Sequence, residues 1–226
     1  EGLAPGAARP AAHTIVRDAA ELERAVARLR SGGLFAFNLE RDHPEPMRAA
    51  LVGIALAGPG IEGLYVPLAH RHLGAPPAVE AATALRLVRP LFEDPRLRRA
   101  GHNVKSDMVL LRRLGWPAPA VEFDTMLASY LLNPSRRSHA LDVVAQEVGG
   151  LAVPSYESVL GSGARSLPLP DLDVERAAAL VCPRVSAILA IRERLETGLR
   201  QDGLLALLDN LELPLASVLA EMEATG

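Results

Sequence analysis

Asn38 and Glu40 are the first side chains in this sequence whose types and spacing suit metal chemistry. They end the apolar run "LFAF" (34–37), which follows the turn residues Gly32 and Gly33 and predicts a buried strand. Side chains two positions apart in a strand point to the same side. Two carboxylates at this spacing would bind a cation, but one of the pair here is an amide. The stretch is therefore either a metal site with a ligand missing or an ordinary strand end, where Asn is common.

Three further polar residues lie at predicted helix starts. Asp107 lies in "VKSDMVLLRRLG", a predicted helix from Val104 to Leu114 that Gly115 closes. Asn103 precedes this helix and is expected to cap it, and Asp124 is expected to cap the helix that follows "VEF". Capping is the simpler role for both residues, and contact with a substrate or metal is the alternative.

The remaining reactive side chains are isolated. His102 and His139 show no zinc spacing, and Cys182 beside a proline is expected to be a small buried residue rather than a nucleophile. Arg136 and Arg137 are expected in a solvated loop, where contact with a phosphate is the alternative. None of these residues alone indicates a reaction.

Hydrophobic periodicity supplies the elements that must position the polar residues. A helix is predicted over 18–30, and three sequential strands over 34–39, 50–57 and 63–68 follow it as hairpins. The later elements predicted are a helix over 77–94, a short strand before the Val104 helix, a strand ending at Phe123, a helix from about Asp124 to Pro134, an amphipathic helix over 138–150, an irregular loop over 151–170, and helices from Asp171 onward. Early strands followed by alternating helices and short strands indicate an α/β domain with a mixed sheet.

Composition excludes several classes of function. The chain has 226 residues, is 49% hydrophobic and 23% charged, and carries a formal net charge of −3, so it has no general attraction for nucleic acid. One cysteine permits no intrachain disulfide, which fits a reducing cytoplasm. We expect no membrane partner, because there is no apolar stretch of transmembrane length and no signal peptide.

Three segments resemble one known family in the same order along the chain. "GHNVKSDMVLLRRLG" resembles the second motif of the DEDD-type 3′–5′ exonuclease domain of bacterial DNA polymerase I, and "EFDTMLASYLLNPSRRSHALDVVA" resembles the segment after it. "LELPLASVLAEMEATG" resembles the start of the polymerase region of family A DNA polymerases. The resemblance implies a ribonuclease H-like α/β exonuclease fold, a mixed sheet flanked by helices and followed by C-terminal helices.

The resemblance also implies that several active-site ligands are missing. In the family, carboxylates from three motifs hold two metal ions that activate a water and stabilise the leaving oxygen. The motif positions in this chain are Asn38, Glu40, Asn103, Asp107, Leu180 and Arg184. Of the four carboxylates only Glu40 and Asp107 remain, and Arg184 adds a positive charge, which leaves one net negative charge for two divalent cations. We therefore expect no active catalytic residue, no cofactor and no bound metal, with Glu40 and Asp107 as remnant ligands.

Two structural expectations concern the third motif. Pro183 should break or restart the late helix, because a proline inside a helix removes a hydrogen bond and clashes with the preceding turn. Arg184 should point into the former metal cavity and pair with Glu40 or Asp107. Asp42 lies in a loop-like stretch beyond the strand end, and Asp171 and Asp173 precede the late helix; substitution of the lost ligands by these acids is the less favoured alternative.

The expected protein is a fragment of a family A DNA polymerase that acts in replication or repair. Residues 1–12 are expected to be a linker, 13–198 an inactive proofreading domain that supports the polymerase domain, and 199–226 the start of the polymerase region. DNA would be contacted through the parent polymerase, a nucleotidyltransferase that would use magnesium in the cytoplasm. An active metal-dependent 3′–5′ exonuclease and a free-standing single-strand DNA-binding module stay open as alternatives.

Overall fold

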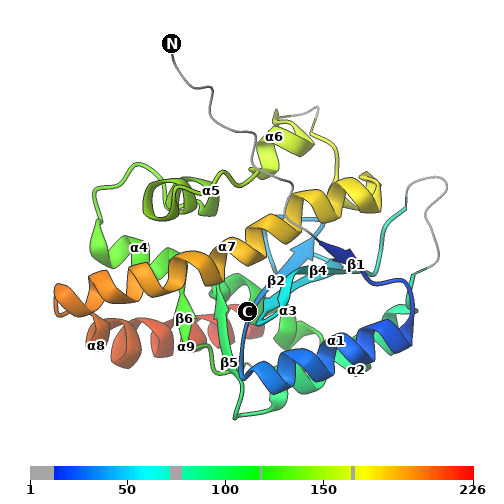
Figure 1. Ribbon diagram of the computed structural model, residues 1–226, viewed down its shortest axis with the longest axis horizontal. Helices are drawn as coiled ribbons and strands as arrows, with labels where there is room; N and C mark the ends of the chain where they lie inside the picture. Colours follow the sequence, from blue (N-terminus) through cyan, green and yellow to red (C-terminus); the bar gives the residue numbers. More distant parts are fainter. Residues whose placement is uncertain (1–12, 72–77, 118, 164–165) are drawn as a thin grey trace.

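A six-stranded mixed sheet forms the centre of the part of the chain that the computed structural model describes, residues 13–71, 78–117, 119–163 and 166–226 (Figure 1). The strand order is β1-β4-β3-β2-β5-β6. β2, β3 and β4 pair antiparallel in sequence order, whereas β1–β4, β2–β5 and β5–β6 pair in parallel. The strands are β1 (Thr14–Ile15), β2 (Leu34–Arg41), β3 (Leu51–Gly58), β4 (Ile61–Pro67), β5 (Arg98–Gly101) and β6 (Phe123–Asp124).

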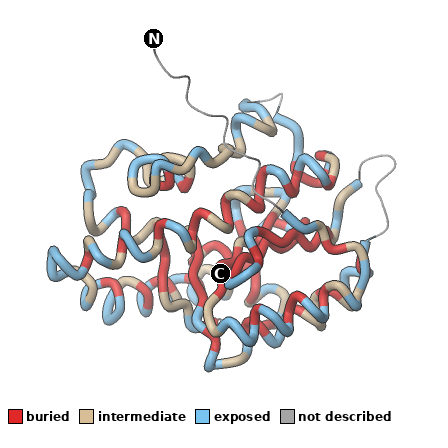
Figure 2. Tube along the Cα trace, viewed as in Figure 1, coloured by how far each residue is buried: buried red, intermediate tan, exposed pale blue. Residues whose placement is uncertain are grey.

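Helices cover both faces of the sheet and bury a separate apolar cluster on each. Phe35, Phe37 and Leu39 of β2 pack against one layer, whereas Ala36 of the same strand packs against the other. The first layer contains α1 (Ala19–Gly32), α2 (Ala81–Glu93) and α3 (Val104–Arg113). The second contains α4 (Thr125–Leu132), α5 (Leu141–Val144) and the long α7 (Val174–Gln201). Buried residues follow the sheet and the inner sides of the helices (Figure 2).

The sequence predicted the early elements well. The Asp18 side chain caps α1, and the face formed by Leu22, Val26 and Leu29 is buried. The predicted hairpin strands correspond to β2, β3 and β4, and β2 extends two residues further than expected, to Arg41. The local pattern is sufficient for these elements, because α1 buries one continuous apolar face and each strand is a short apolar run bounded by turn residues. The short strand β1 was not predicted, and the expected linker over 1–12 lies outside the described residues.

The expected break at Pro183 is wrong. α7 runs without interruption through Pro183 for 28 residues. The carbonyl that loses its hydrogen bond belongs to Ala179, which is exposed, so water can satisfy it. Buried residues on both sides of Pro183, among them Leu180 and Val185, keep the helix packed on the sheet. Tertiary packing therefore outweighs the local cost of proline.

The segment expected to be an irregular loop, 151–170, contains two short helices. These are α6 (Tyr156–Leu160), which Ser155 caps, and the 3-10 helix η3 (Leu169–Asp171). The helix expected over 138–150 starts later than predicted, as α5, and continues as the π-helix η1 (Ala145–Gly149). Its end at paired glycines is confirmed, because Gly150 has a left-handed backbone.

The C-terminal helices pack beside the first layer. After α7 come α8 (Leu205–Leu207), the π-helix η4 (Leu208–Glu212) and α9 (Leu213–Thr225). α9 lies against α3, where Ala220 is buried and Glu223 and Glu221 form ion pairs with Lys105 and Arg112. In the described ranges no single helix is long and apolar enough to cross a membrane, although α7 and α8–α9 together, bent by 109°, meet that criterion of length and composition.

Candidate active site

Asn38 and Glu40 lie on the face of β2 that α7 covers, as the strand alternation predicted. Glu40 is 2% exposed, and Asn38 is half-buried. Asn38 Nδ2 donates a hydrogen bond to Glu40 Oε1 at 2.5 Å. The amide at the first motif position is therefore a hydrogen-bond donor to its carboxylate neighbour.

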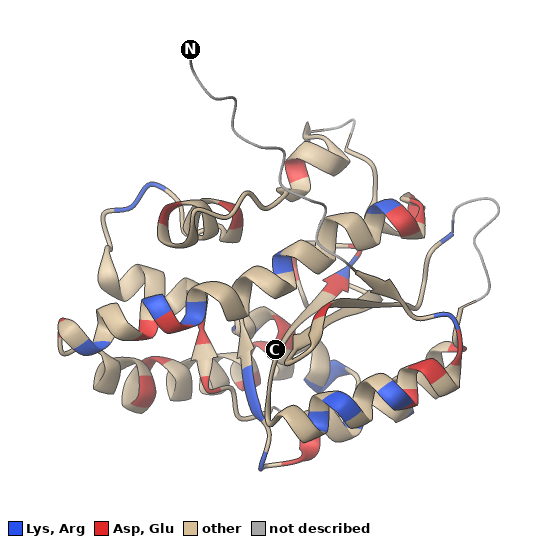
Figure 3. Cartoon of the chain, in the orientation of Figure 1, with Lys and Arg blue, Asp and Glu red and all other residues tan. Residues whose placement is uncertain are grey.

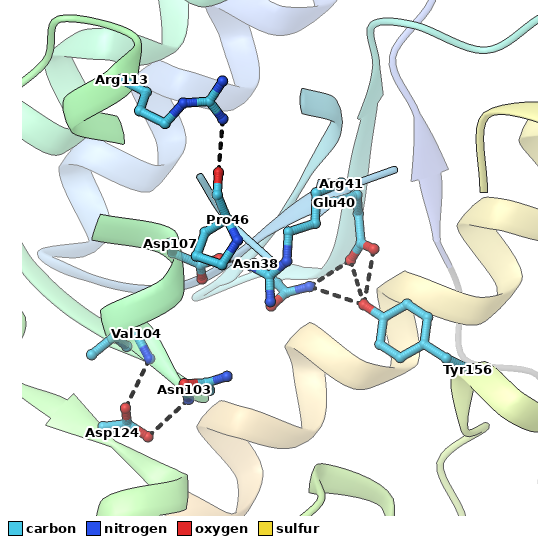
Figure 4. Close-up of polar contacts among 10 residues, drawn as sticks. All are labelled: Asn38, Glu40, Arg41, Pro46, Asn103, Val104, Asp107, Arg113, Asp124 and Tyr156. Atoms are coloured by element: carbon cyan, nitrogen blue, oxygen red, sulfur yellow. Dashed lines mark hydrogen bonds and ion pairs between the residues drawn. The ribbon is translucent and has the colours of Figure 1, made fainter. Parts of the chain in front are cut away.

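Tyr156 is the main partner of Glu40 and was missed by the sequence analysis. Its hydroxyl lies 3.0 Å from Glu40 Oε1 and 2.9 Å from Glu40 Oε2, and it donates its proton to the carboxylate (Figure 4). Asn38 Nδ2 lies 3.2 Å from the same hydroxyl. Tyr156 comes from α6, 116 residues after Glu40. The local signal was only a serine cap before "YESVL", which predicts a helix start but no distant contact.

Asp107 is paired with Arg41, which the sequence analysis also missed. Arg41 Nη1 lies 3.3 Å from Asp107 Oδ1, and Asp107 is 1% exposed. The register of β2 on β3 shifts between Glu40 and Arg41, and such an irregularity redirects side chains. Arg113 of α3 donates to the carbonyl oxygen of Pro46 at 2.7 Å, which ties the loop after β2 to the helix that carries Asp107 (Figure 4).

Arg184 is buried beside this site, but the expected ion pair is wrong. It is 8% exposed, its Nη1 donates to the carbonyl oxygen of Pro154 at 2.8 Å, and its guanidinium stacks 4.4 Å from the centre of the Tyr156 ring. Among the described residues, the cation that pairs with Asp107 is Arg41. The Tyr156 ring takes the position next to the guanidinium, so that Tyr156 connects Arg184 with Glu40. Leu180, one turn earlier, is fully buried in the apolar cluster around α7.

Burial dominates the electrostatics of both acids. Desolvation raises the pKa of Glu40 above its ordinary value, although hydrogen bonds from Asn38 and Tyr156 and the charge of Arg184 act in the opposite direction. Burial raises the pKa of Asp107 well above its usual range, with the charge of Arg41 opposing it. The same desolvation, with the negative charge of Glu40, raises the pKa of the Tyr156 hydroxyl, so that this phenol stays a donor.

Asp124 caps two helices, and Asn103 does not act as expected. Asn103 occupies the N-cap position of α3 with φ 61°, but its side chain makes no capping hydrogen bond. Asp124 replaces it: the backbone amides of Asn103 and Val104 lie 3.1 and 2.8 Å from its two carboxylate oxygens (Figure 4). The expected capping of α4 by Asp124 is confirmed, with the Met126 amide at 2.8 Å.

The other predicted polar residues have partners outside this site. Cys182 is buried as expected, and burial raises the pKa of its thiol to about 12. His102 bonds Thr125 at 2.9 Å, and burial lowers the pKa of this histidine to about 3. His139 bonds Ser129 at 2.9 Å.

The remaining charged side chains are also used elsewhere. Arg136 bonds Ser129 and Glu147, and Arg137 is exposed. The acids considered as substitutes have other roles: Asp42 accepts from the Ala50 amide at 2.7 Å, Asp171 pairs with Arg71 at 3.4 Å, and Asp173 caps α7.

The sheet order, the helices on both faces and the polar site at the end of β2 define a ribonuclease H-like exonuclease fold. Residues 64–191 match the family described as DNA polymerase I, ribonuclease H-like domain. The chain belongs to this family and is homologous to the 3′–5′ exonuclease region of DNA polymerase I.

Curated relatives extend the similarity over nearly the whole chain. It is 34% identical over 97% of its length to DNA polymerase I of Chloroflexus aurantiacus and 30% identical over 95% to that of Pseudomonas aeruginosa. It covers 23% and 24% of these two relatives, so it spans about a quarter of their length.

Solved structures agree on the fold. The Pol1 polymerase domain of M. smegmatis in complex with DNA primer-template and dNTP is 24% identical, with a TM-score of 0.73 over 94% of this chain and 32% of that one. Escherichia coli RNase D is 15% identical, with a TM-score of 0.62 over 95% of this chain and 50% of that one.

Proposed function

We propose that this chain is the proofreading region of a DNA polymerase I in which the exonuclease reaction has been lost, and that it supports the polymerase region structurally. The observation that carries the proposal is the pairing of the two remaining acids with groups of the same chain. Glu40 is bound by Asn38 and Tyr156, and Asp107 by Arg41.

The charge of the pocket opposes cation binding. Each of the two carboxylates, Glu40 and Asp107, has a guanidinium group beside it: Arg41 pairs with Asp107, and the charge of Arg184 acts on Glu40. Two divalent ions about 4 Å apart repel each other and need a strongly negative cage. The two guanidinium groups offset much of the negative charge that such a cage requires.

The donor set also does not fit a pair of hard cations. Mg²⁺ takes six oxygen ligands in near-octahedral geometry. In the described residues no three His, Cys, Asp or Glu side chains are placed to share a metal ion, and the one carboxylate oxygen of this pair without a partner is Oδ2 of Asp107. Both oxygens of Glu40 accept from Tyr156. The residues present therefore do not fit a pair of Mg²⁺ ions.

The group that would orient an attacking water is also missing from its motif position. Leu180 stands where the family motif has tyrosine, and its apolar side chain is buried. Tyr156 does not replace it, because the Tyr156 hydroxyl donates to Glu40.

A nuclease assay tests the loss of activity directly. The purified chain is incubated with a 5′-labelled single strand in Mg²⁺ and in Mn²⁺, and the products are separated by length. We expect no shortening above the protein-free control, with an active proofreading exonuclease as positive control. Mn²⁺ titration followed by electron paramagnetic resonance should show no site at submillimolar concentrations. Successive release of 3′-terminal nucleotides would overturn the proposal in favour of an active exonuclease.

The structural role is supported by the C-terminal helices. α9 is fixed to α3 by two ion pairs, and it leaves large apolar side chains exposed, together with those of the preceding turns: Leu207, Leu211, Leu215, Val218, Leu219 and Met222. An apolar row of this size favours a covering partner. The proposed partner is the polymerase region of the same protein, because the curated relatives are about four times longer than this chain.

DNA contact in this proposal is a property of the whole polymerase. The chain carries both signs of charge, and α1 and α7 each bear acidic and basic segments in Figure 3. The matching M. smegmatis polymerase structure contains DNA. We assign magnesium use and nucleotidyl transfer to the polymerase region and place the protein in the cytoplasm. The boundaries proposed from sequence, 13–198 and 199–226, keep the exposed apolar row on the polymerase side.

A further inference from the structure

The segment 153–160 crosses from the α5 side of the molecule to the acid pair and is held there by polar contacts. It contains Pro154, whose carbonyl accepts from Arg184 at 2.8 Å, and α6, whose first residue is Tyr156. Tyr156 donates to Glu40, and its ring lies against the Arg184 guanidinium. Two residues of one short segment therefore bind two different elements, β2 and α7.

These contacts matter because the segment has little else to hold it. α6 has five residues and no fully buried side chain, and a helix of that length does not form by itself in water. Val153, Tyr156, Val159 and Leu160 are only partly buried against the apolar cluster around α7. A hydrogen bond to a buried charge is stronger than one between neutral groups, so the Tyr156–Glu40 contact is the firmest anchor.

We propose that segment 153–160 is a built-in plug, locked over the former metal position by the Tyr156–Glu40 hydrogen bond and the Arg184–Pro154 contact. The proposal rests on the proposed function, since it assigns Glu40 of β2 a structural role. Glu40 stabilises the protein's own segment in place of a cation or a substrate.

The geometry explains why the plug closes the site. Both oxygens of Glu40 face the Tyr156 hydroxyl, and Arg184 on α7 donates to the carbonyl oxygen of Pro154 in the same segment. Glu40 and Asp107 are almost completely buried. Access to either oxygen of Glu40 requires that Tyr156 leaves, and the departure of Tyr156 also exposes the stacked face of Arg184.

Hydrogen exchange of the 226-residue protein measures the opening of the plug. Peptides covering 153–162 are compared in the native protein, in Tyr156→Phe and in Tyr130→Phe, where Tyr130 is a matched tyrosine that is 51% exposed. We expect Tyr156→Phe to accelerate exchange in 153–162 by roughly 10- to 100-fold, the range for losing a hydrogen bond to a charged group. Tyr130→Phe should leave this region unchanged, and α1 peptides should be unchanged in both variants, which confirms an intact fold.

A double-mutant cycle with Glu40→Gln shows whether the two side chains act through each other. If Tyr156→Phe has its effect through Glu40, the combined variant should exchange no faster than the faster single variant. Unchanged exchange of 153–162 in Tyr156→Phe, or effects that multiply independently, would overturn the plug.

The two proposals fail in different ways. Nuclease activity of the native protein overturns the proposed function, whatever the exchange of 153–162. If residues 153–162 exchange as slowly in Tyr156→Phe as in the native protein, and the native protein is inactive, only the plug is overturned.

Discussion

Asp124 shows at the scale of one residue how two helix starts can depend on a single buried carboxylate. It accepts from backbone amides at the starts of both α3 and α4, and it is 1% exposed. The sequence predicted the α4 cap, because that cap is local. It could not predict the α3 cap, because the two partners are 20 residues apart in the chain.

We expect Asp124→Ala to destabilise the protein by roughly 2–4 kcal/mol, since it leaves the buried amide of Val104 and three partly buried amides without their acceptor. Asp18→Ala is the matched control: Asp18 caps only α1 and is exposed, so its removal should cost about 1 kcal/mol. Urea unfolding of both variants gives the comparison. Equal losses for the two variants would contradict the double cap.

At the polar site, the sequence predicted some of the residues but not their partners. Asn38 and Glu40 were singled out by their spacing in a predicted strand, and Asp107 by the resemblance of its segment to a family motif. Tyr156 and Arg41 were missed because their contacts depend on how α6 packs and on a register shift in β2, and neither is encoded in local periodicity. The predicted partner of the acids was Arg184, and the residues that fill this role are Tyr156 and Arg41.

At the scale of elements, α7 shows that packing on the sheet can keep a helix continuous through a proline. The helix contacts every strand from β1 to β5, and Pro183 lies inside it. The expectation that proline breaks a helix considers the helix alone. In this protein, residues before and after Pro183 are buried against the sheet and keep α7 continuous.

Replacement of Pro183 by alanine should therefore raise the free energy of unfolding, by about 1–2 kcal/mol, because it restores a backbone hydrogen bond within a helix that already forms. Pro90→Ala in α2 is a suitable control, because Pro90 is also inside a helix but is exposed. Thermal and urea unfolding report both effects. A loss of stability in Pro183→Ala alone would mean that the ring itself is needed for packing on the sheet.

At the scale of the molecule, two apolar clusters form the core, and the exposed apolar row along α8, η4 and α9 lies outside them. The C-terminal sequence "LLALLDNLELPLASVLAEME" is rich in apolar residues. Several of its larger side chains are exposed, Leu211, Val218 and Met222 among them.

The isolated chain should self-associate through this row at high concentration, because exposed apolar patches drive association. Leu211→Lys combined with Val218→Lys should keep the protein monomeric in sedimentation experiments, with the free energy of unfolding within about 0.5 kcal/mol of the native value. Leu213→Lys is the control for burial, since Leu213 is 8% exposed and should destabilise the fold instead. A native chain that stays monomeric at millimolar concentration would contradict the prediction.

The pairing of Glu40 and Asp107 with side chains of the same protein has a consequence for single substitutions at this site. Asn38→Asp alone would place a second acid beside buried Glu40, and Arg184→Asp alone would remove the cation stacked on Tyr156. Each of these substitutions creates an uncompensated buried charge, which costs stability before any ion can offset it. Under the proposed function, nuclease activity could therefore return only through several substitutions made together, because each single one destabilises the protein.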